Sequence, residues 1–280
     1  PSVARAPTPQ AALVPSPVAT PTAAPAPAKP TPVAPAEPVA EKPKYGGVLR
    51  TLGRADITNY DVHQVISYLD LHPLAPAYNL LIRSDPKDVN KLGPDLAESW
   101  EASADGKVYT FHLRRGVKFH DGTPLTSADV KASFDRIVSP PKGVLSQRQA
   151  YFDAVDKIEA PDGYTVRFLL KRPQTAFPAI VSVPFNAVFP KALLDQKVDM
   201  KKDIVGTGPF RLKEYIRGVQ FVMEKNPDYF VPGRPYLDGI VRYIIPDVGT
   251  AKGAFVAGRL DLMQPIMPYT DTEMTEWKKQ

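Results

Sequence analysis

The sequence contains no cysteine. Disulfide bridges, thiolate metal sites and cysteine nucleophiles are therefore excluded as sources of stability or chemistry. Long apolar runs are also lacking, because no stretch approaches the ~20 residues of a membrane-spanning helix. No signal peptide precedes the ordered part, and we interpret the sequence as a processed or trimmed chain.

Charge of one sign is not concentrated anywhere in the chain. The 35 Lys and Arg residues and the 30 Asp and Glu residues leave a net charge of +5, of which +2 belongs to residues 1–44. The basic residues are scattered among acidic ones, without the basic stripe and stacking aromatics that mark a nucleic-acid surface. We therefore expect no nucleic-acid partner.

Residues 1–44 differ in composition from the rest of the chain. They include thirteen Pro and twelve Ala and have no hydrophobic periodicity. This composition predicts a disordered, polyproline-like linker, which at roughly 3.1 Å per residue would reach on the order of 130 Å. We expect a tether that holds an extracytoplasmic domain near a membrane; a disordered end without a role is the alternative.

The clearest local signals lie between Leu92 and Ser139. Two runs rich in β-formers, 98–102 and 107–113, flank Ser103–Gly106, whose Asp-Gly pair suits a hairpin turn. The segment His120–Pro124 combines Asp, Gly and Pro and predicts a sharp corner.

A capped helix is predicted directly after this corner. Thr126 is the expected N-cap, and Asp129 three residues later completes a capping-box-like pair. Val130, Phe134 and Ile137 lie on one side of this helix and are expected to pack on the hairpin.

The remaining elements predict a mixed α+β fold. Helices are expected at 74–82, 174–180, 191–195 and 250–257. Strands are expected at 48–52, 156–160, 164–170, 210–216, 220–225, 240–245 and 260–263.

Several short runs occur in a characteristic order along the chain. They are Gly46–Leu49, Pro94–Trp100, Tyr109–Ser133, Gly206–Phe210, Asn226–Phe230, Pro235–Ile240 and Ala257–Leu262. In order and spacing the chain resembles the extracellular solute-binding proteins of family 5, the peptide- and nickel-binding receptors of ABC importers. One departure is Asn59–His63, where family members often carry a Leu-Asp-Pro-like run.

The resemblance implies a periplasmic-binding-protein-like fold of two lobes that close on a ligand. It places most of the first lobe in residues 45–263 and the start of a crossover to a truncated second lobe in residues 264–280. The implied function is capture of a short peptide or similar small polar solute outside the cytoplasmic membrane, and its delivery to an ABC permease. We expect a monomer in the periplasm or at the cell surface, without cofactor or catalysis, that meets the membrane through its tether.

Loop residues at the edges of the lobe are the expected ligand contacts. Thr58, Asn59, Tyr60 and Asp61 follow the first predicted strand, Val183, Pro184, Phe185 and Asn186 form a second segment, and Thr207 and Gly208 a third. For each of them a structural role in the loop or the core is the competing interpretation.

Other function classes receive weaker support from the residues. His120 beside Asp121 would be the catalytic pair of a hydrolase, but neighbouring residues at a strand end point in different directions. His63 and His72 are nine residues apart, with no third metal ligand nearby, so we expect no metal site. A signalling or interaction module on the same fold remains an alternative function.

Overall fold

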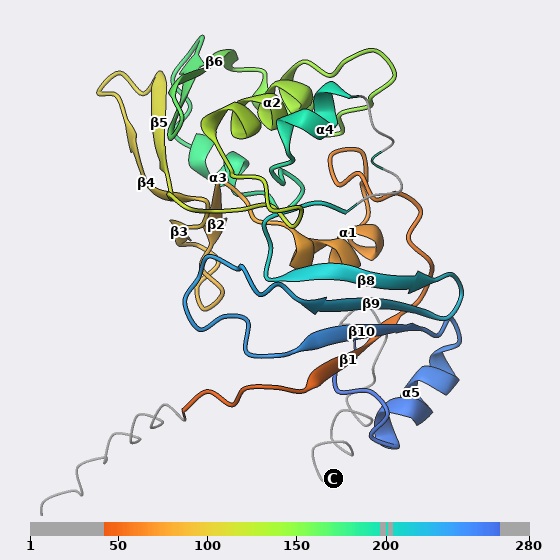
Figure 1. Ribbon diagram of the computed structural model, residues 1–280. Coiled ribbons are helices and arrows are strands. Elements are labelled where there is room, and N and C mark those ends of the chain that lie inside the picture. The colour runs from red at the N-terminus through yellow and green to blue at the C-terminus, as the bar shows by residue number, and fades with distance from the viewer. Residues whose placement is uncertain (1–41, 197–199, 201–203, 264–280) are drawn as a thin grey trace, which may run out of the picture. The chain divides into compact units, whose positions relative to one another are not determined.

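The computed structural model describes residues 42–196, 200 and 204–263, and residues 43–280 form one unit of the chain. Residues 1–41 of the predicted linker and the whole predicted crossover, 264–280, lie outside the described residues. The described strands form two four-stranded sheets and one two-stranded sheet. In the upper part of Figure 1 one large sheet lies with α2 (Ser127–Val138), and in the lower part the other large sheet lies with α1 (Tyr68–Leu74) and α5 (Val248–Val256).

The upper sheet is antiparallel throughout, with the order β4-β5-β7-β6. Both hairpins expected in this part of the chain are confirmed. In the first turn Gly106 adopts φ 67°, which glycine reaches without a steric penalty. The strands are β4 (Ala97–Ala102), β5 (Val108–Leu113), β6 (Val155–Asp162) and β7 (Thr165–Leu170).

Helix α2 (Ser127–Val138) covers the upper sheet and begins where the sequence predicts it. The Asp129 carboxylate accepts hydrogen bonds from the backbone N–H and the hydroxyl of Thr126, both at 2.8 Å. On the buried side of α2, the Phe134 ring lies 5.1 Å from the ring of Phe168 in β7. Short helical segments complete this part: η2 (Gln149–Phe152), α3 (Phe177–Val181) and α4 (Lys191–Asp195).

The lower sheet has the order β1-β10-β9-β8, with β1 parallel to β10 and the other pairs antiparallel. Its strands are β1 (Val48–Gly53), β8 (Phe210–Ile216), β9 (Gln220–Lys225) and β10 (Gly239–Ile244). Alternate residues of a strand point to opposite faces, so Thr51 and Leu52 serve different layers.

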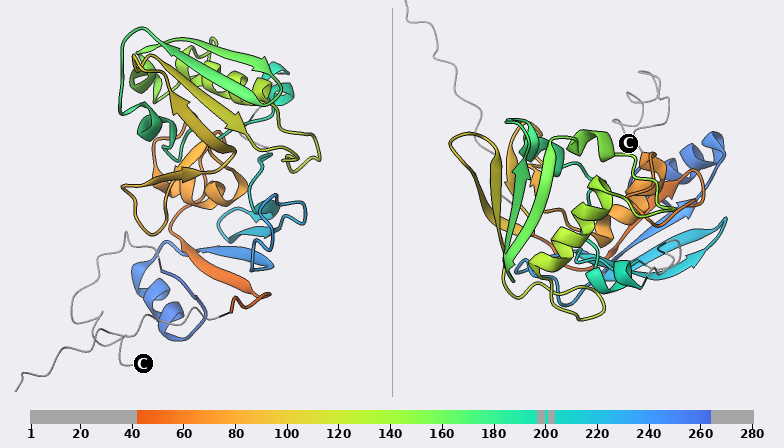
Figure 2. Two further views of the ribbon diagram at one scale, coloured as in Figure 1. Left: turned by 90° about the vertical axis from the view of Figure 1, so that its left-hand side faces the viewer. Right: turned by 90° about the horizontal axis from the view of Figure 1, so that it is seen from above.

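The two faces of the lower sheet carry different helices, α1 (Tyr68–Leu74) with η1 (Ala75–Ala77) on one and α5 (Val248–Val256) on the other (Figure 2). The α1 face contains Leu71, Leu74, Phe221 and Met223 in one apolar cluster. Leu52 packs with residues of α5 in a separate cluster. Among the described residues no helix is long and apolar enough to cross a bilayer.

The helix expected at 74–82 is wrong in its position. Helix α1 begins after Ser67, whose side chain accepts a hydrogen bond from the Leu69 N–H at 3.0 Å. Residues 82–84 form a strand instead, because they pair with a following segment: β2 (Ile82–Ser84) lies antiparallel to β3 (Leu92–Pro94). The strand expected at 260–263 is reduced to a single bridge between Thr51 and Leu262.

Candidate functional site

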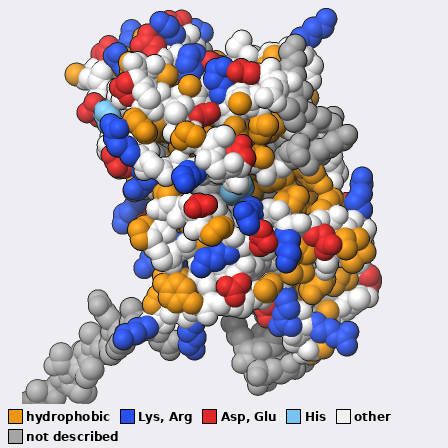
Figure 3. Space-filling model, in the orientation of Figure 1, with side chains coloured by type: hydrophobic (Ala, Val, Ile, Leu, Met, Phe, Trp, Pro, Cys, Tyr) orange, Lys and Arg blue, Asp and Glu red, His pale blue; other side chains and the backbone are white. Residues whose placement is uncertain are grey.

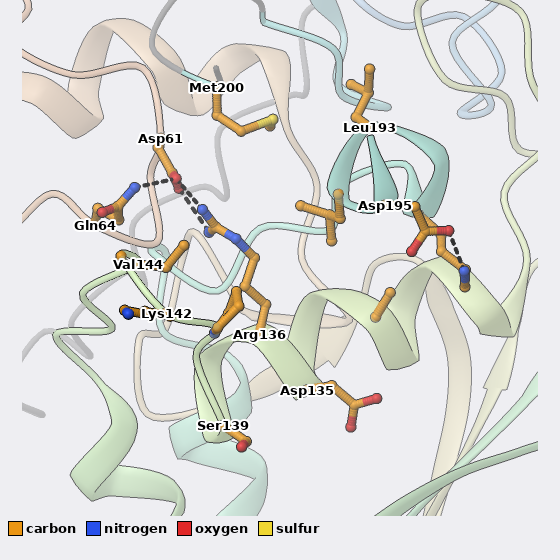
Figure 4. Close-up of a pocket in the computed structure, with 15 residues that line it drawn as sticks. Asp61, Gln64, Asp135, Arg136, Ser139, Lys142, Val144, Leu193, Asp195 and Met200 are labelled. Atoms are coloured by element: carbon orange, nitrogen blue, oxygen red, sulfur yellow. Dashed lines mark hydrogen bonds and ion pairs between the residues drawn. The ribbon is translucent and has the colours of Figure 1, made fainter. Parts of the chain in front are cut away.

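The loop after β1 is fixed to α2 by a buried carboxylate. The Asp61 side chain forms an ion pair with Arg136 of α2 and also accepts hydrogen bonds from Gln64 and from the His63 N–H (Figure 4). Burial by itself would raise the pKa of Asp61, but the Arg136 hydrogen bond and neighbouring positive charge hold that pKa below its usual value. Asp61 is therefore ionised and holds the loop in place.

His63 is fully enclosed behind this ion pair. Its Nε2 lies 2.8 Å from the Ala187 carbonyl oxygen, and its Nδ1 lies 3.1 Å from an Arg136 nitrogen. A carbonyl only accepts and a guanidinium only donates, so the neutral ring with its proton on Nε2 satisfies both contacts. Burial, the largest cause, lowers the pKa of His63 to about 4, in agreement with a neutral ring.

Arg148 joins the same loop to two further segments. Its guanidinium donates to the carbonyl oxygens of His63 and Val65 and lies 3.9 Å from the centroid of the Phe185 ring. Three segments that are far apart in sequence, 61–68, 144–148 and 183–187, therefore meet around one buried arginine.

An apolar face is exposed where these segments meet. We define it by the residues Ile66, Tyr68 and Leu145, which are 73%, 50% and 65% exposed. The Tyr68 ring lies 5.3 Å from the Phe185 ring, and the Leu145 N–H donates to Gln64 at 3.3 Å. Figure 3 shows hydrophobic side chains gathered on the right-hand side of the molecule, around the level of α1 in Figure 1.

A cavity of about 680 Å³ with a mixed polar and apolar lining adjoins the apolar face, since Gln64 and Val144 line it. Its walls come from the loop after β1, the end of α2 and α4, with Leu193 and Met200 opposite Arg136 (Figure 4). An exposed Lys142 stands beside paired charges such as Lys191 with Asp195. Apolar contacts next to a few oriented polar groups are the usual composition of a small-solute site.

The predicted residues of the first loop lie beside this site and already make internal contacts. The N–H and hydroxyl of the exposed Thr58 donate to Asp70 at 2.7 and 3.0 Å. Asn59 accepts from the Asp61 N–H at 2.9 Å, and the Tyr60 ring packs against Tyr215. Their contact with a ligand stays a prediction.

The second predicted segment contributes to the same region. Pro184 is exposed and Val183 half-buried, whereas Phe185 and Asn186 are buried. The Asn186 amide donates to the Ile180 carbonyl oxygen at 2.8 Å, while its own oxygen is enclosed without a partner in the described part of the chain. The structure thus brings 58–61 and 183–186 to one side of the lobe.

Thr207 and Gly208 contact η1 and the residues just after it. The Thr207 hydroxyl donates to Asn79 at 3.1 Å, and the Gly208 N–H donates to the Ala77 carbonyl oxygen at 2.9 Å. These contacts give both residues packing roles inside the lobe, and their ligand role also stays a prediction.

The His120–Asp121 pair serves the local fold. A His120 ring nitrogen lies 3.0 Å from the Gly208 carbonyl oxygen. Asp121 accepts from both the N–H and the hydroxyl of Thr123 at the corner. Within the described residues, no group of three or more His, Asp or Glu side chains is placed to hold a metal ion.

Sequence reasoning missed Ile66, Tyr68, Leu145 and Arg148. A loop with large apolar residues at Ile66 and Tyr68 was visible in the sequence, but their exposure depends on how distant segments fold against it. The contacts of Arg148 are equally non-local, and no spacing in the sequence signals them.

The comparison that decides the family covers most of the chain. A family profile described as bacterial extracellular solute-binding proteins, family 5 Middle, matches residues 91–279. The chain belongs to this family. The resemblance seen in the short sequence runs is thereby confirmed.

Curated members of family 5 with similar sequences are peptide-binding proteins. The chain is 31% identical over 246 residues to the oligopeptide-binding protein AppA of Bacillus subtilis, covering 85% of this chain and 44% of AppA. It is 35% identical over 193 residues to the glutathione-binding protein GsiB of Escherichia coli, covering 68% of this chain and 36% of GsiB. The chain thus spans less than half the length of these relatives.

Solved structures of family 5 proteins support the predicted fold class. The periplasmic binding protein DppA of Helicobacter pylori, in complex with the peptide STSA, aligns with a TM-score of 0.74 and 29% identity over 85% of this chain and 49% of DppA. The binding protein MoaA of A. tumefaciens, in complex with mannopinic acid, aligns with a TM-score of 0.75 and 29% identity over 84% of this chain and 48% of MoaA. The mixed α+β fold of periplasmic binding proteins is confirmed.

Proposed function

We propose that the protein is the substrate-binding component of an ABC importer, capturing a short peptide or a similar small polar solute and delivering it to a permease. The observation that carries this proposal is the exposed apolar face of Ile66, Tyr68 and Leu145 beside a cavity with a mixed polar and apolar lining. Family membership and the peptide-binding relatives support the same solute class.

The geometry around Arg148 favours binding over catalysis. The charged groups nearest the apolar face are used internally: Asp61 by Arg136, and Arg148 by two carbonyl oxygens. A rigid support with exposed apolar side chains suits ligand capture, whereas a catalytic site needs a group poised to exchange a proton. We therefore propose a receptor without enzymatic activity, and no hydrolytic role for His120 and Asp121.

The setting of this receptor follows from its family and its first residues. We propose a monomer in the periplasm or at the cell surface, with residues 1–44 as the linker to a membrane anchor. Residues 45–263 form most of one lobe in this proposal, and residues 264–280 begin the passage to a second lobe. Binding would then need contacts with both lobes. A ligand shifts the equilibrium between the open and closed states through contacts that differ between these states.

Native mass spectrometry of the receptor, purified without denaturation, tests the proposal. The expected result is a small solute that leaves the protein on collisional activation, together with recovery of permease subunits after crosslinking in cells. A receptor that carries no solute and takes up none from a mixture of di- and tripeptides would contradict the proposed function. Recovery of a sensor kinase in place of a permease would favour the signalling alternative.

A further inference from the structure

A second cavity, of about 340 Å³, lies between the lower sheet and α1, and its lining residue His72 packs against Tyr68 of the apolar face, with the ring centroids 5.4 Å apart. Its lining is mostly apolar and includes Leu49, Met223 and Ile240 from three neighbouring strands. The polar groups in its wall are Thr51, His72 and Arg242. Because Thr51 is paired with Arg242 across β1 and β10, both side chains point from the sheet to the same face.

Arg242 is a buried cation without a counter-charge in the described part of the chain. Its side chain is in the core of the lobe, with the residue 8% exposed. Among the described residues it forms neither a side-chain hydrogen bond nor an ion pair. Burial lowers its pKa to about 10, and burying an unpaired charge is costly.

Two other arginines of the lobe, in contrast, have partners for their charge. Arg136 is paired with Asp61, and Arg148 donates to two carbonyl oxygens and covers an aromatic ring. Arg242 instead faces a cavity, and the electrostatic neighbour that the structure gives it is His72. A histidine is no counter-ion for a guanidinium, so none of the described residues compensates the positive charge of Arg242 there.

The backbone makes room for this guanidinium at Gly53. A Cβ atom at Gly53 would lie 2.9 Å from Nε of Arg242, closer than non-bonded atoms pack. The Gly53 carbonyl still accepts the Ile245 N–H at 2.8 Å, so the glycine remains part of the sheet. The absence of a side chain there lets the arginine lie along β1.

We propose that this cavity binds the carboxylate end of a small solute, with the carboxylate on Arg242 and the apolar part against Leu49, Met223 and Ile240. The inference rests on the proposed receptor function and narrows the solute class to carboxylic acids. A guanidinium pairs with a carboxylate through two parallel hydrogen bonds. A phosphate is less suitable, because the mostly apolar wall offers few further donors for its additional charge.

The volume limits the size of the group that enters. Cavities of roughly 300 Å³ are at the small end of ligand sites, so a short-chain acid or the C-terminal residue of a peptide is the expected occupant. The experiment below distinguishes these two sources of the same chemical group.

The direct test follows the Nε–Hε signal of Arg242 by NMR in the 280-residue chain, with the signal assigned by its loss in Arg242→Met. Propionate is expected to shift it saturably, and propionamide is expected to bind at least about tenfold more weakly, because it lacks the charge that strengthens the hydrogen bonds. Arg242→Lys keeps the charge without the two-pronged geometry and is expected to weaken propionate binding while the fold is retained. Equal responses to propionate and propionamide would overturn the proposal, as would a propionate response of the neighbouring amides that persists in Arg242→Met.

Two further arms separate the sources of the carboxylate. In the triple variant Asp271→Asn, Glu273→Gln, Glu276→Gln, propionate binding is expected to be unchanged. If only this variant binds propionate, one of the chain's own carboxylates occupies the site in the wild type. That result would overturn the proposal. With the intact receptor, calorimetry compares trialanine with trialanine amide. If the peptide C-terminus is the source, Arg242→Met is expected to weaken trialanine about 10- to 100-fold and to leave the amide unaffected.

The carboxylate site and the proposed receptor function can fail independently of each other. Failure of every peptide to bind, with propionate still bound at Arg242, would contradict the peptide receptor and support the carboxylate site for short-chain acids. The opposite outcome is a peptide affinity that is the same in wild type and Arg242→Met and the same for free and amidated C-termini, with no response to propionate. That result would leave the receptor function in place and overturn the carboxylate site. Arg242→Met should fold normally, because it replaces a buried charge with an apolar side chain of similar length; its thermal unfolding provides the check.

Discussion

Asp61 and Arg136 form an ion pair in which the two side chains are 1% and 10% exposed, and this pair joins the loop after β1 to α2. The loop carries Ile66 and Tyr68 of the apolar face a few residues further along the chain. The position of the proposed binding surface therefore depends on a buried electrostatic contact between two distant segments.

Replacing Asp61 with Asn should destabilise the protein strongly. The substitution leaves the Arg136 charge buried without a carboxylate, and breaking such a pair typically costs about 3–5 kcal/mol. Urea unfolding followed by circular dichroism measures the loss. The matched control is Asp153→Asn, which breaks the exposed pair with Arg172 and should cost no more than about 1 kcal/mol. Equal losses in the two variants would show that the Asp61–Arg136 pair does not hold the loop.

His63 should make stability depend on pH between about 6.5 and 4. The unfolded chain takes up its proton near the ordinary pKa of 6.5, whereas burial lowers the folded pKa to about 4. Above pH 6.5 the ring is neutral in both the folded and the unfolded state, so it does not alter the free energy of unfolding. Below pH 6.5, protonation of the unfolded chain lowers the free energy of unfolding by up to about 3 kcal/mol. The free energy of unfolding, measured from pH 7 to pH 4.5 in wild type and His63→Gln, tests this.

The comparison with His63→Gln is needed because Asp95 acts with the opposite sign. Burial raises the Asp95 pKa to about 6, so its protonation on folding adds stability as the pH falls below that value. The expected outcome is a wild-type advantage over His63→Gln that shrinks as the pH falls. Parallel curves for wild type and His63→Gln would contradict the buried, neutral histidine.

The elements with local signals could be predicted from the sequence, and those set by distant contacts could not. The Thr126–Asp129 capping box and the Asp105-Gly106 turn lie within a few residues, and both α2 and the first hairpin are where the sequence places them. The helix expected at 74–82 was misplaced because residues 82–84 pair with 92–94 in the two-stranded sheet, and helix propensity in 74–82 carries no information about that pairing.

The residues of the candidate site could likewise be predicted only where their signal is local. The sequence pointed to the loop after β1, which is polar, rich in Asx residues and follows a strand, and to the Pro-Phe-Asn segment of 183–186 as a loop at the lobe edge. It did not reveal that Arg148 joins these segments or that Ile66 and Leu145 are exposed, since contacts and exposure are properties of the assembled lobe.

Gly208 should tolerate no side chain, in contrast to a glycine in α5. A Cβ at Gly208 would lie 2.4 Å from the Pro76 carbonyl oxygen and 2.4 Å from the Ala77 carbonyl carbon. These are backbone atoms that cannot move aside, so Gly208→Ala should cost about 3 kcal/mol or more. The control is Gly253→Ala, in α5 with no atom within 4 Å of the added Cβ, which should be neutral or stabilising by about 0.5–1 kcal/mol. Thermal unfolding of both variants gives the answer, and a Gly208→Ala protein of normal stability that no longer binds solute would instead assign Gly208 to the ligand.

The apolar face should affect binding without affecting folding. Tyr68 and Leu145 are largely exposed in the lobe, so Tyr68→Ala and Leu145→Ser should each change the free energy of unfolding by less than about 1 kcal/mol. If a solute covers them, each truncation removes apolar contact worth about 1–2 kcal/mol, which raises the dissociation constant about five- to thirtyfold. Calorimetry with trialanine and the intact receptor measures this. Val89→Ser is the matched control, because Val89 is 75% exposed in the connection between β2 and β3, outside the apolar face. An unchanged affinity in Tyr68→Ala and Leu145→Ser, or an equal loss in Val89→Ser, would remove these residues from the binding surface.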